Sequence, residues 1–310
     1  MKKLKKWSLG LLSFILLFLL ATFIFHRISL VKEQASLTPV GQQVLVNGHQ
    51  MNVYIEGDGP ETIVILSGAG IASPILDFKN VSDSLSKKYK VVIVERAGYG
   101  YSDDSNQSRD VVEVLSETRQ ALSQANVTGP FIILSHSMAS LESLAWQEQY
   151  PDEVKALVGL DWALPSSYED LKENQALLTI AYWSSKIGLL RYFPESFYIK
   201  NPTLTESERN QYKLLAYKQL ISQAMLHESR LVKENAKKVS SSINPKIPTL
   251  LMVSSGEGTT FSQSEWQHYA MRFASDQSNV QVIYIDAPHD LYHYQSHEVI
   301  TRIEEFLDNN

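Results

Sequence analysis

Two side chains in the sequence have the types and positions that nucleophilic catalysis needs, and the first is Ser137. It lies in residues 135–139 (SHSMA), between the apolar run 131–134 and a predicted helix. A serine on a sharp strand-to-helix turn exposes its hydroxyl for attack, and small residues two positions away on either side relieve the crowding of the turn. Ser135 and Ala139, both small, stand in these flanking positions, where glycine is usual. Helix capping is the simpler role for such a serine, so the chemical interpretation requires a partner.

The second side chain is His289, which would serve as the base for Ser137. It follows residues 280–285, the last predicted strand, and it is the one histidine of eight in a strand-end loop near the C-terminus. A serine hydroxyl is activated when an adjacent base accepts its proton. His289, His293 and His297 recur every four residues, as metal ligands on a helix would, but His289 is expected in a loop and no further ligand set accompanies it. The predicted chemistry therefore requires no metal ion and no organic cofactor.

A sheet must position these two residues, because strands and helices are expected to alternate along most of the chain. The Asn47-Gly48 pair between two strand-like runs predicts a β-hairpin. Continuous apolar strands separated by helices indicate an α/β fold, a mostly parallel sheet with helices on both faces. Reactive residues of such sheets lie at the carboxyl ends of the strands, where Ser137 and His289 are both expected. The predicted strands are residues 42–46, 50–56, 61–66, 90–94, 131–134, 156–160, 249–253 and 280–285.

Residues 163–248 interrupt this alternation. They contain no strand-like run and carry aromatic residues at helical spacing, and Thr205 with Glu208 has the capping-box pattern of a helix start. We expect a helical insertion that covers the carboxyl ends of the strands as a lid. Its aromatic residues either line an apolar pocket or form the core of the insertion itself.

Residues 7–25 are predicted to cross a membrane. These 19 residues are predominantly apolar and uncharged, and four of the six residues before them are lysines. At about 1.5 Å per residue the run spans roughly 28 Å, close to the hydrocarbon thickness of a bilayer. A cleaved signal peptide has a shorter apolar region and a small-residue cleavage site, so an uncleaved single-pass anchor is preferred. Residues 1–30 then form a cytoplasmic basic flank and transmembrane anchor, residues 31–41 a connector, and residues 42–310 a domain on the extracytoplasmic side of the cell membrane.

The charge distribution supports the same division. The chain of 310 residues has a formal net charge of −6. Residues 1–27 contain five bases and no acid, so the remaining residues carry −11. An acidic domain disfavours nucleic acid as a partner, because phosphate binding requires a basic surface. The absence of cysteine excludes disulfides, thiolate zinc sites and a cysteine nucleophile.

Five features together resemble the α/β-hydrolase superfamily over roughly residues 42–310. Ser67 and Glu95 replace the histidine and the aspartate with which two of these motifs begin in typical members. The combination in this order, at predicted strand ends, is far more specific than any single motif. The features are residues 67–70 (SGAG), residues 95–102 (ERAGYGYS), the turn at 135–139, residues 150–154 (YPDEV) and His289.

This resemblance implies a Ser-His-acid triad. Ser137 would be the nucleophile, and His289 would pass its proton to the leaving group. The main-chain N–H groups of Ala69 and Met138 would hold the oxyanion. Because these donors belong to the main chain, serine in place of histidine at position 67 need not disable the oxyanion hole.

The acid of the triad has two candidates. The family usually places it after the strand predicted at residues 249–253, where this chain reads SSGEGT, with Thr259 in the expected position. Asp161 ends the preceding strand, where some lidded members carry their acid, and it is the preferred candidate. Glu257 lies in the usual loop and is the alternative. The role requires a buried carboxylate that fixes the tautomer of the histidine.

The predicted function is a serine hydrolase that cleaves carboxylic esters, or related acyl bonds, through an acyl-Ser137 intermediate. The anchor and the aromatic insertion indicate a small-molecule or amphiphilic acyl substrate. A peptidase of the iminopeptidase type shares these motifs, but it would need carboxylates in the insertion to bind a free amine. A non-catalytic binding or sensor domain on the same fold is the alternative outside enzymes. The carboxylates available to a peptidase are Glu169, Asp170, Glu173 and Glu195.

Overall fold

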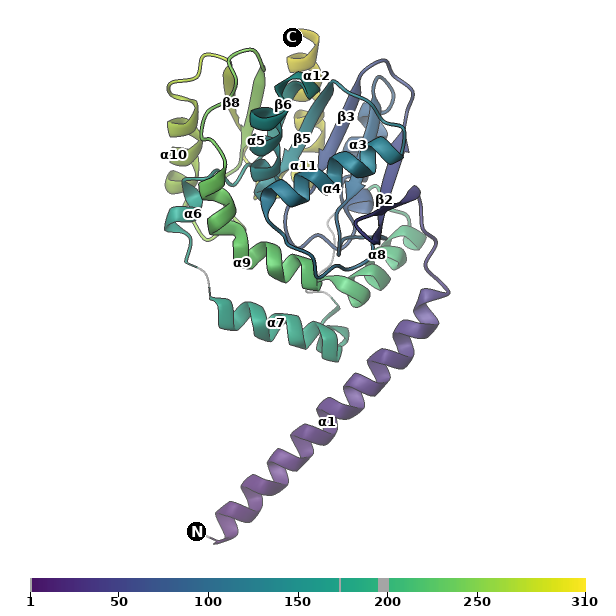
Figure 1. Ribbon diagram of the computed structural model, residues 1–310. Coiled ribbons are helices and arrows are strands. Elements are labelled where there is room, and N and C mark those ends of the chain that lie inside the picture. Colours follow the sequence, from purple (N-terminus) through teal and green to yellow (C-terminus); the bar gives the residue numbers. More distant parts are fainter. Residues whose placement is uncertain (1, 173, 195–200) are drawn as a thin grey trace.

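An eight-stranded sheet with the strand order β1-β2-β4-β3-β5-β6-β7-β8 forms the centre of the protein (Figure 1). The computed structural model describes residues 2–172, 174–194 and 201–310. Strand β2 pairs antiparallel with β1 and with β4, and the other neighbours pair in parallel. The predicted mostly parallel α/β sheet is therefore confirmed. The strands are β1 Gln42–Val46, β2 His49–Glu56, β3 Thr62–Leu66, β4 Lys90–Glu95, β5 Phe131–His136, β6 Val154–Leu160, β7 Thr249–Val253 and β8 Val280–Tyr284.

The first two strands form the predicted hairpin. Val46 faces His49 across it, and Asn47 and Gly48 have φ values of 48° and 86°. A two-residue turn with positive φ at both central positions matches the right-handed twist of the flanking strands, and asparagine followed by glycine adopts it at low cost.

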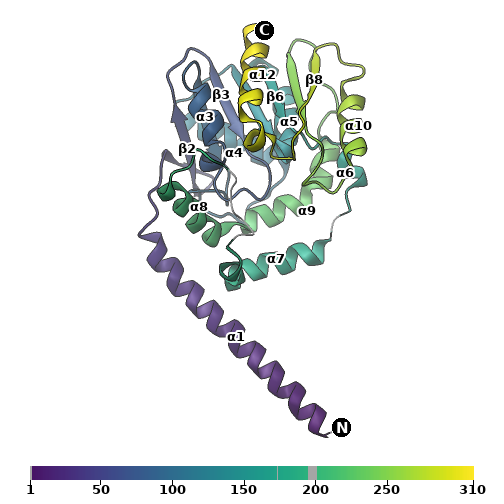
Figure 2. The ribbon, with the colours of Figure 1, turned by 180° about the vertical axis from the view of Figure 1, so that it is seen from behind.

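Helices cover both faces of the sheet, because alternate residues of each central strand point into different cores. In β3, Val64 and Leu66 belong to the core under α4, α5 and α10, whereas Ile63 and Ile65 belong to the core under α3, α11 and α12. Figure 2 shows α12 on the face opposite to α5. The helices around the sheet are α2 Pro74–Asp77, α3 Lys79–Leu85, α4 Val111–Gln124, η1 Ser137–Ala139, α5 Ser140–Gln149, η2 Pro151–Glu153, α10 Gln263–Ala274, α11 Leu291–Tyr294 and α12 Ser296–Asp308.

A helical segment joins β6 to β7, as the interrupted alternation predicts. Its longest helices, α8 and α9, begin at caps that the sequence encodes: Thr205 and Glu208 form the predicted capping box, and the Ser222 side chain accepts a hydrogen bond from the N–H of Met225. In Figure 1, α9 and then α7 lie beyond the carboxyl ends of the parallel strands. The elements of this segment are α6 Ser167–Asp170, α7 Gln175–Ile187, η3 Leu189–Tyr192, α8 Glu206–Gln219 and α9 Gln223–Lys238.

The N-terminal helix α1 (Lys2–Gln34) extends away from the sheet (Figures 1 and 2). Within it, Lys6–Gln34 is long and apolar enough to cross a membrane, and an 18-residue window of this stretch has a mean hydropathy of 2.5 and is 6% buried. The helix continues four residues into the predicted connector 31–41, because Glu33 binds Arg191 of η3 at 2.6 Å and keeps the last turn ordered.

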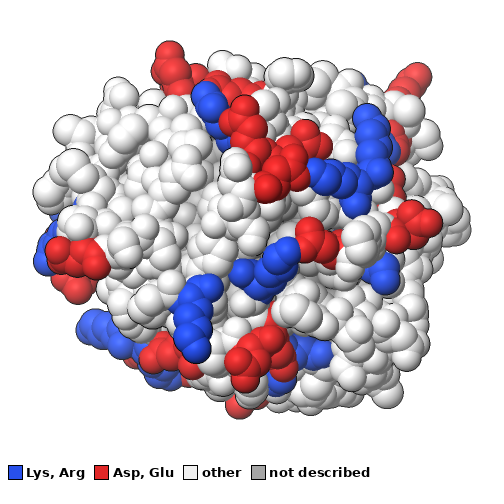
Figure 3. Space-filling view, turned by 90° about the horizontal axis from the view of Figure 1, so that it is seen from above, with Lys and Arg blue, Asp and Glu red and all other residues white. Residues whose placement is uncertain are grey.

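Lys and Arg side chains are interspersed with Asp and Glu on the face that Figure 3 shows, at the end of the domain farthest from α7. Such a mixed surface favours solvation over the binding of one large charged partner on this face.

Candidate active site

Ser137 lies at the carboxyl end of β5, on the turn into η1 and α5. Its φ of 53° is left-handed, which is uncommon for a side chain other than glycine, asparagine or aspartate and often marks a functional turn. The turn is crowded, since Ser135 and Ala139 are almost fully buried. Serine is accommodated at position 135 because its hydroxyl accepts hydrogen bonds from Trp162 Nε1 at 2.8 Å and from Ser143 Oγ at 2.7 Å.

His289 lies in the loop that follows β8, and it contacts Ser137. Its Nε2 is 2.8 Å from Ser137 Oγ, and its Nδ1 is 2.6 Å from Asp161 Oδ2. A carboxylate only accepts hydrogen bonds, so the proton of the neutral imidazole belongs on Nδ1 and leaves Nε2 free to accept the serine proton. The Trp266 ring packs edge to face with the imidazole, with ring centroids 5.6 Å apart.

Asp161 is fully buried just after β6, and its carboxylate is held by four donors. Oδ1 accepts hydrogen bonds from the Ser254 N–H at 2.7 Å and from Trp266 Nε1 at 2.8 Å. Oδ2 accepts from Ser254 Oγ at 2.6 Å and from His289 Nδ1. Donors on both oxygens fix the plane of the carboxylate, so that Oδ2 stays aimed at His289 Nδ1.

The structure does not bring the Glu257 carboxylate to the histidine. The Glu257 side chain is exposed, and the residue contacts His289 through its main-chain oxygen, which accepts the His289 N–H at 2.8 Å. Of the two candidate acids, Asp161 is therefore the one whose carboxylate touches the imidazole. Glu257 shapes the loop instead.

Ala69 and Met138, the two expected oxyanion donors, line the same cavity as Ser137 and His289. The loop that carries Ala69 approaches the serine turn closely, since a Cβ added to Gly68 would lie 2.9 Å from His136 Nδ1 and 3.0 Å from Ser137 Cβ. Only glycine allows this approach at position 68.

A buried ion-pair network, which was not predicted from the sequence, lies behind this loop. Arg96 Nη2 donates to the Gly68 oxygen at 3.4 Å, and its guanidinium pairs with Glu142 of α5 at 3.4 Å and with Glu228 of α9 at 3.5 Å. Burial alone would lower the pKa of Arg96, but the Glu228 carboxylate, with Tyr99 and Glu142, raises it above the ordinary value. The arginine therefore stays charged and ties the loop to α5 and α9. The motif at residues 95–102 was the one available signal for it.

His136 is buried beside His289. Its ring lies 4.7 Å from that of His289, and its Nε2 is 3.3 Å from the His289 oxygen. Burial, with the nearby His289, holds the pKa of His136 well below its usual value. The residue is thus neutral and packs beside His289 without adding a positive charge there.

A cavity of about 420 Å³ opens at the serine. It receives residues from the serine turn, from α7 and α9, and from the loop before α10. Its wall is mainly apolar, as in sites that bind small organic molecules. The apolar residues on it include Leu171, Leu177, Leu178, Val232, Phe261 and Trp266.

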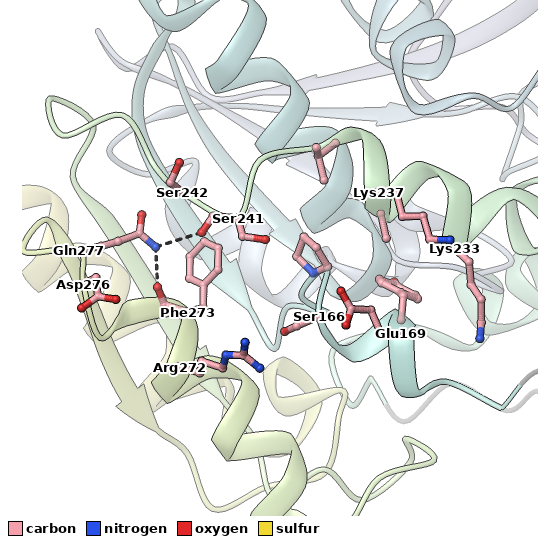
Figure 4. Close-up of a pocket in the computed structure, with 14 residues that line it drawn as sticks. Ser166, Glu169, Lys233, Lys237, Ser241, Ser242, Arg272, Phe273, Asp276 and Gln277 are labelled. Carbon is pink, nitrogen blue, oxygen red and sulfur yellow. Dashed lines mark hydrogen bonds between the residues drawn. The ribbon is translucent and has the colours of Figure 1, made fainter.

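A larger cavity of about 880 Å³ lies elsewhere, between α6, α9 and α10 (Figure 4). Lys233, Lys237 and Arg272 share its wall with Glu169 and Asp276, and neither Ser137 nor His289 contributes to it. It is a polar groove of mixed charge, and Ser137 and His289 open onto the smaller cavity instead.

Of the four carboxylates available to a peptidase, the two that lie within the described residues, Glu169 and Asp170, do not line the cavity at Ser137. Glu169 lines the larger groove, and Asp170 accepts a hydrogen bond from Tyr269 at 2.7 Å. Glu173 and Glu195 lie outside the described residues. In the described part of the chain, no three His, Cys, Asp or Glu side chains are grouped as metal ligands.

Comparison with known proteins identifies the family. The family model described as the alpha/beta hydrolase fold matches residues 61–186. An uncharacterized protein, YbdG of Bacillus subtilis (strain 168), is 32% identical over 99% of this chain and 97% of its own length. The chain belongs to the α/β-hydrolase fold superfamily.

Solved structures of other α/β-hydrolases share the fold. The enol-lactonase from Burkholderia xenovorans LB400 superposes with a TM-score of 0.61 at 13% identity, covering 86% of this chain and 100% of the lactonase. A membrane phospholipase A superposes with a TM-score of 0.63 at 15% identity, covering 98% of both chains. Coverage of 98% includes most of α1, so the fold likeness to that protein extends to the N-terminal helix.

Proposed function

We propose that this α/β-hydrolase is a serine hydrolase that cleaves carboxylic esters through an acyl-Ser137 intermediate. The observation that carries the proposal is the continuous chain of contacts from Ser137 Oγ to His289 Nε2 at 2.8 Å and from His289 Nδ1 to Asp161 Oδ2 at 2.6 Å. These are the groups and distances that nucleophilic catalysis by serine requires.

The reaction proceeds in two halves. Ser137 Oγ attacks the ester carbonyl carbon while its proton moves to His289 Nε2, and the resulting oxyanion accepts hydrogen bonds from the Ala69 and Met138 N–H groups. His289 then protonates the departing alcohol, which leaves acyl-Ser137. In the second half, His289 takes a proton from water, the hydroxide attacks the acyl carbon, and Ser137 departs with its proton restored. Asp161 stabilises the imidazolium in both halves.

The cavity favours an apolar acyl or alcohol group over a charged peptide end. Among its described lining residues, Lys172 is charged and no carboxylate is present. An iminopeptidase needs such a carboxylate for the free amine, so ester hydrolysis is the better-supported activity.

We also infer that residues 163–248 act as a lid and that α1 anchors the domain to the membrane. Leu177 and Leu178 of α7 and Val232 of α9 line the cavity, so a movement of the helical segment would change access to Ser137. Helix α1 has the length and hydropathy of a bilayer span. Residues 1–30 then form the cytoplasmic flank and anchor, and residues 42–310 form the hydrolase domain outside the cytoplasm.

Labelling with a fluorophosphonate probe tests the proposed activity on the full chain purified in detergent. We expect one label on the wild-type protein and none on Ser137→Ala, with faster turnover of a short p-nitrophenyl ester than of an aminoacyl amide. Failure of the wild-type protein to react, while a control esterase reacts, would instead support a non-catalytic binding or sensor domain.

A further inference from the structure

Helix α7 exposes an apolar face. Among its 13 residues Lys186 is the one charged side chain. Leu177, Ile180 and Trp183 are 61%, 62% and 57% exposed, and their spacing of three residues places them on one side of the helix. Soluble surfaces rarely gather large apolar side chains in this way, whereas interaction surfaces do.

The end of this helix is docked on α1. The Tyr192 hydroxyl of η3 lies 3.1 Å from Thr22 Oγ1, and its ring is 5.8 Å from that of Phe18. A Cβ added to Gly188, whose φ is 91°, would lie 2.4 Å from the Cβ of His26, so the backbone itself touches α1 there. These contacts lie between Phe18 and His26 of α1, and they fix the position of the end of α7 along the axis of α1.

Ion pairing reinforces the contact. Arg191 of η3 forms a two-pronged pair with Glu33 at 2.7 and 2.6 Å, and its Nε donates to His26 Nδ1 at 2.8 Å. Two parallel hydrogen bonds between an arginine and a carboxylate fix the orientation of both groups more firmly than a single bond would. Helix α7 and α1 are therefore held together and present one continuous surface to their surroundings.

The register along α1 indicates what lies against this surface. Phe18 and Thr22 belong to the apolar run 7–25, and Phe18 is nine residues before Arg27, which is roughly 13 Å along a helix axis. A bilayer crossed by α1 would therefore surround Tyr192 and bring lipid to the end of α7. The mixed-charge face of Figure 3 lies on the opposite side of the domain.

Helix α7 also forms a wall of the candidate active site. Leu178 and the exposed Leu177 line the cavity that reaches Ser137 and His289, so the exposed apolar face, which continues through Ile180 and Trp183, meets the cavity at Leu177. We propose that α7 lies in the interfacial layer of the bilayer beside α1, and that membrane-resident acyl esters of the glycerolipid class reach Ser137 along it. The substrate part of this proposal rests on the ester hydrolysis proposed above, whereas the lipid contact does not.

The absence of cysteine allows a direct test of the lipid contact. Ile180→Cys and the matched control Met271→Cys, 55% exposed on α10, are each labelled with an environment-sensitive fluorophore in the full chain. In vesicles of phosphatidylcholine and phosphatidylglycerol we expect a blue shift at position 180, and quenching by lipids that carry a nitroxide near the headgroup end of the acyl chain. The label at 271 should report water in the same vesicles.

Single-copy nanodiscs separate lipid from a second protein copy. The lipid contact is overturned if the label at position 180 stays in water. It is also overturned if the label is shielded only when several copies share a vesicle and is not quenched by the nitroxide lipids. Because this measurement can be made on a Ser137→Ala background, it does not depend on catalysis.

A second arm tests delivery of substrate. Ile180→Glu with Trp183→Glu should reduce turnover of a glycerolipid ester in vesicles by at least about tenfold, since partitioning of two carboxylates into the interface costs more than about 1.4 kcal/mol. Turnover of a short water-soluble ester should not change, and Met271→Glu should alter neither rate. Equal turnover of the lipid ester by the variant and the wild type overturns the delivery route. If the wild type does not hydrolyse the short water-soluble ester, the proposed ester hydrolysis is refuted instead.

Discussion

His289 and Asp161 meet because the residues that follow β8 and β6 lie at the same edge of the sheet. Asp161 follows β6 with a φ of 49°, and the donors Ser254 and Trp266 come from the region after β7. Without a carboxylate at position 161, the N–H and hydroxyl of Ser254 and the indole N–H of Trp266 would lose their acceptor in the interior, which would destabilise the fold.

Asp161→Asn should lower kcat for a soluble ester about 10⁴-fold with little change in KM, because an amide cannot hold His289 in the required tautomer. Glu257→Gln should leave kcat unchanged, since its side chain is exposed and its contact with His289 uses the main chain. Steady-state kinetics with both variants, after circular dichroism confirms their folding, measures the difference. The opposite order of the two effects would make Glu257 the acid.

Glu95 predicts a pH dependence of stability. Its carboxylate is fully buried, accepts the Tyr101 N–H at 2.8 Å and Asn52 Nδ2 at 3.0 Å, and has its pKa raised by burial to about 7. The folded state therefore holds a proton that the unfolded state releases between its ordinary pKa and about 7. This contribution to stability is complete at acidic pH and is lost as pH rises through 7.

The size of the effect is about 3 kcal/mol across that range, at 1.36 kcal/mol per pKa unit. Urea unfolding of the full chain in detergent, at about pH 5 and about pH 8, should show a smaller pH dependence for Glu95→Gln than for the wild type. Glu61→Gln, a half-exposed carboxylate outside the core, serves as the control. An unchanged pH dependence in Glu95→Gln would mean that Glu95 titrates normally.

Among the elements, the loop at residues 67–70, α5 and α9 are joined by one buried cation. Arg96 contacts Gly68, Glu142 and Glu228, which belong to these three elements in turn. Removing the cation leaves the buried carboxylates of Glu142 and Glu228 without the positive charge of Arg96, and burial already raises the pKa of Glu142. The consequence should be a loss of stability together with a less rigid loop at residues 67–70.

Arg96→Met should lower the free energy of unfolding by about 3–5 kcal/mol, the cost of leaving buried charges unpaired. Arg302→Met, on the exposed side of α12, should change it by less than about 0.5 kcal/mol. Urea unfolding followed by tryptophan fluorescence measures both. Equal stability of the two variants would show that the carboxylates find other partners.

In the whole molecule, α1 is both a candidate membrane span and a packing partner of α7 and η3. Thr22, His26 and Glu33 each contact the segment between Gly188 and Tyr192. A signal peptide that is cleaved away would leave these contacts unmade. The packing therefore favours a retained helix.

The protein in the membrane fraction should accordingly have the mass of the uncleaved chain, 35.0 kDa, and should resist extraction at alkaline pH. Intact-mass spectrometry of the solubilised protein measures this. A mature form that lacks α1 would refute the anchor. Ser137→Ala, made in parallel, should have the same membrane distribution as the wild type, because anchoring is independent of catalysis.

Much of this fold was predictable because its signals are local. Apolar runs of strand length, the Asn47-Gly48 turn and the capping box at Thr205 each act over a few residues. The ion pairs of Arg96 were not predictable in the same way. They join positions 46 and 132 residues apart, and nothing in a charged residue identifies its distant partner.

The sequence by itself determined the parallel sheet, the serine turn after β5 and the histidine after β8, because chain order and strand periodicity place these residues at one edge of the sheet. Only the tertiary structure decided which carboxylate reaches His289. Asp161 and Glu257 both follow strands adjacent in the sheet, and burial and hydrogen-bond donors, not spacing, brought Asp161 to the imidazole. It also decided that α7 lies against α1, because contact between helices about 160 residues apart depends on how the whole chain packs.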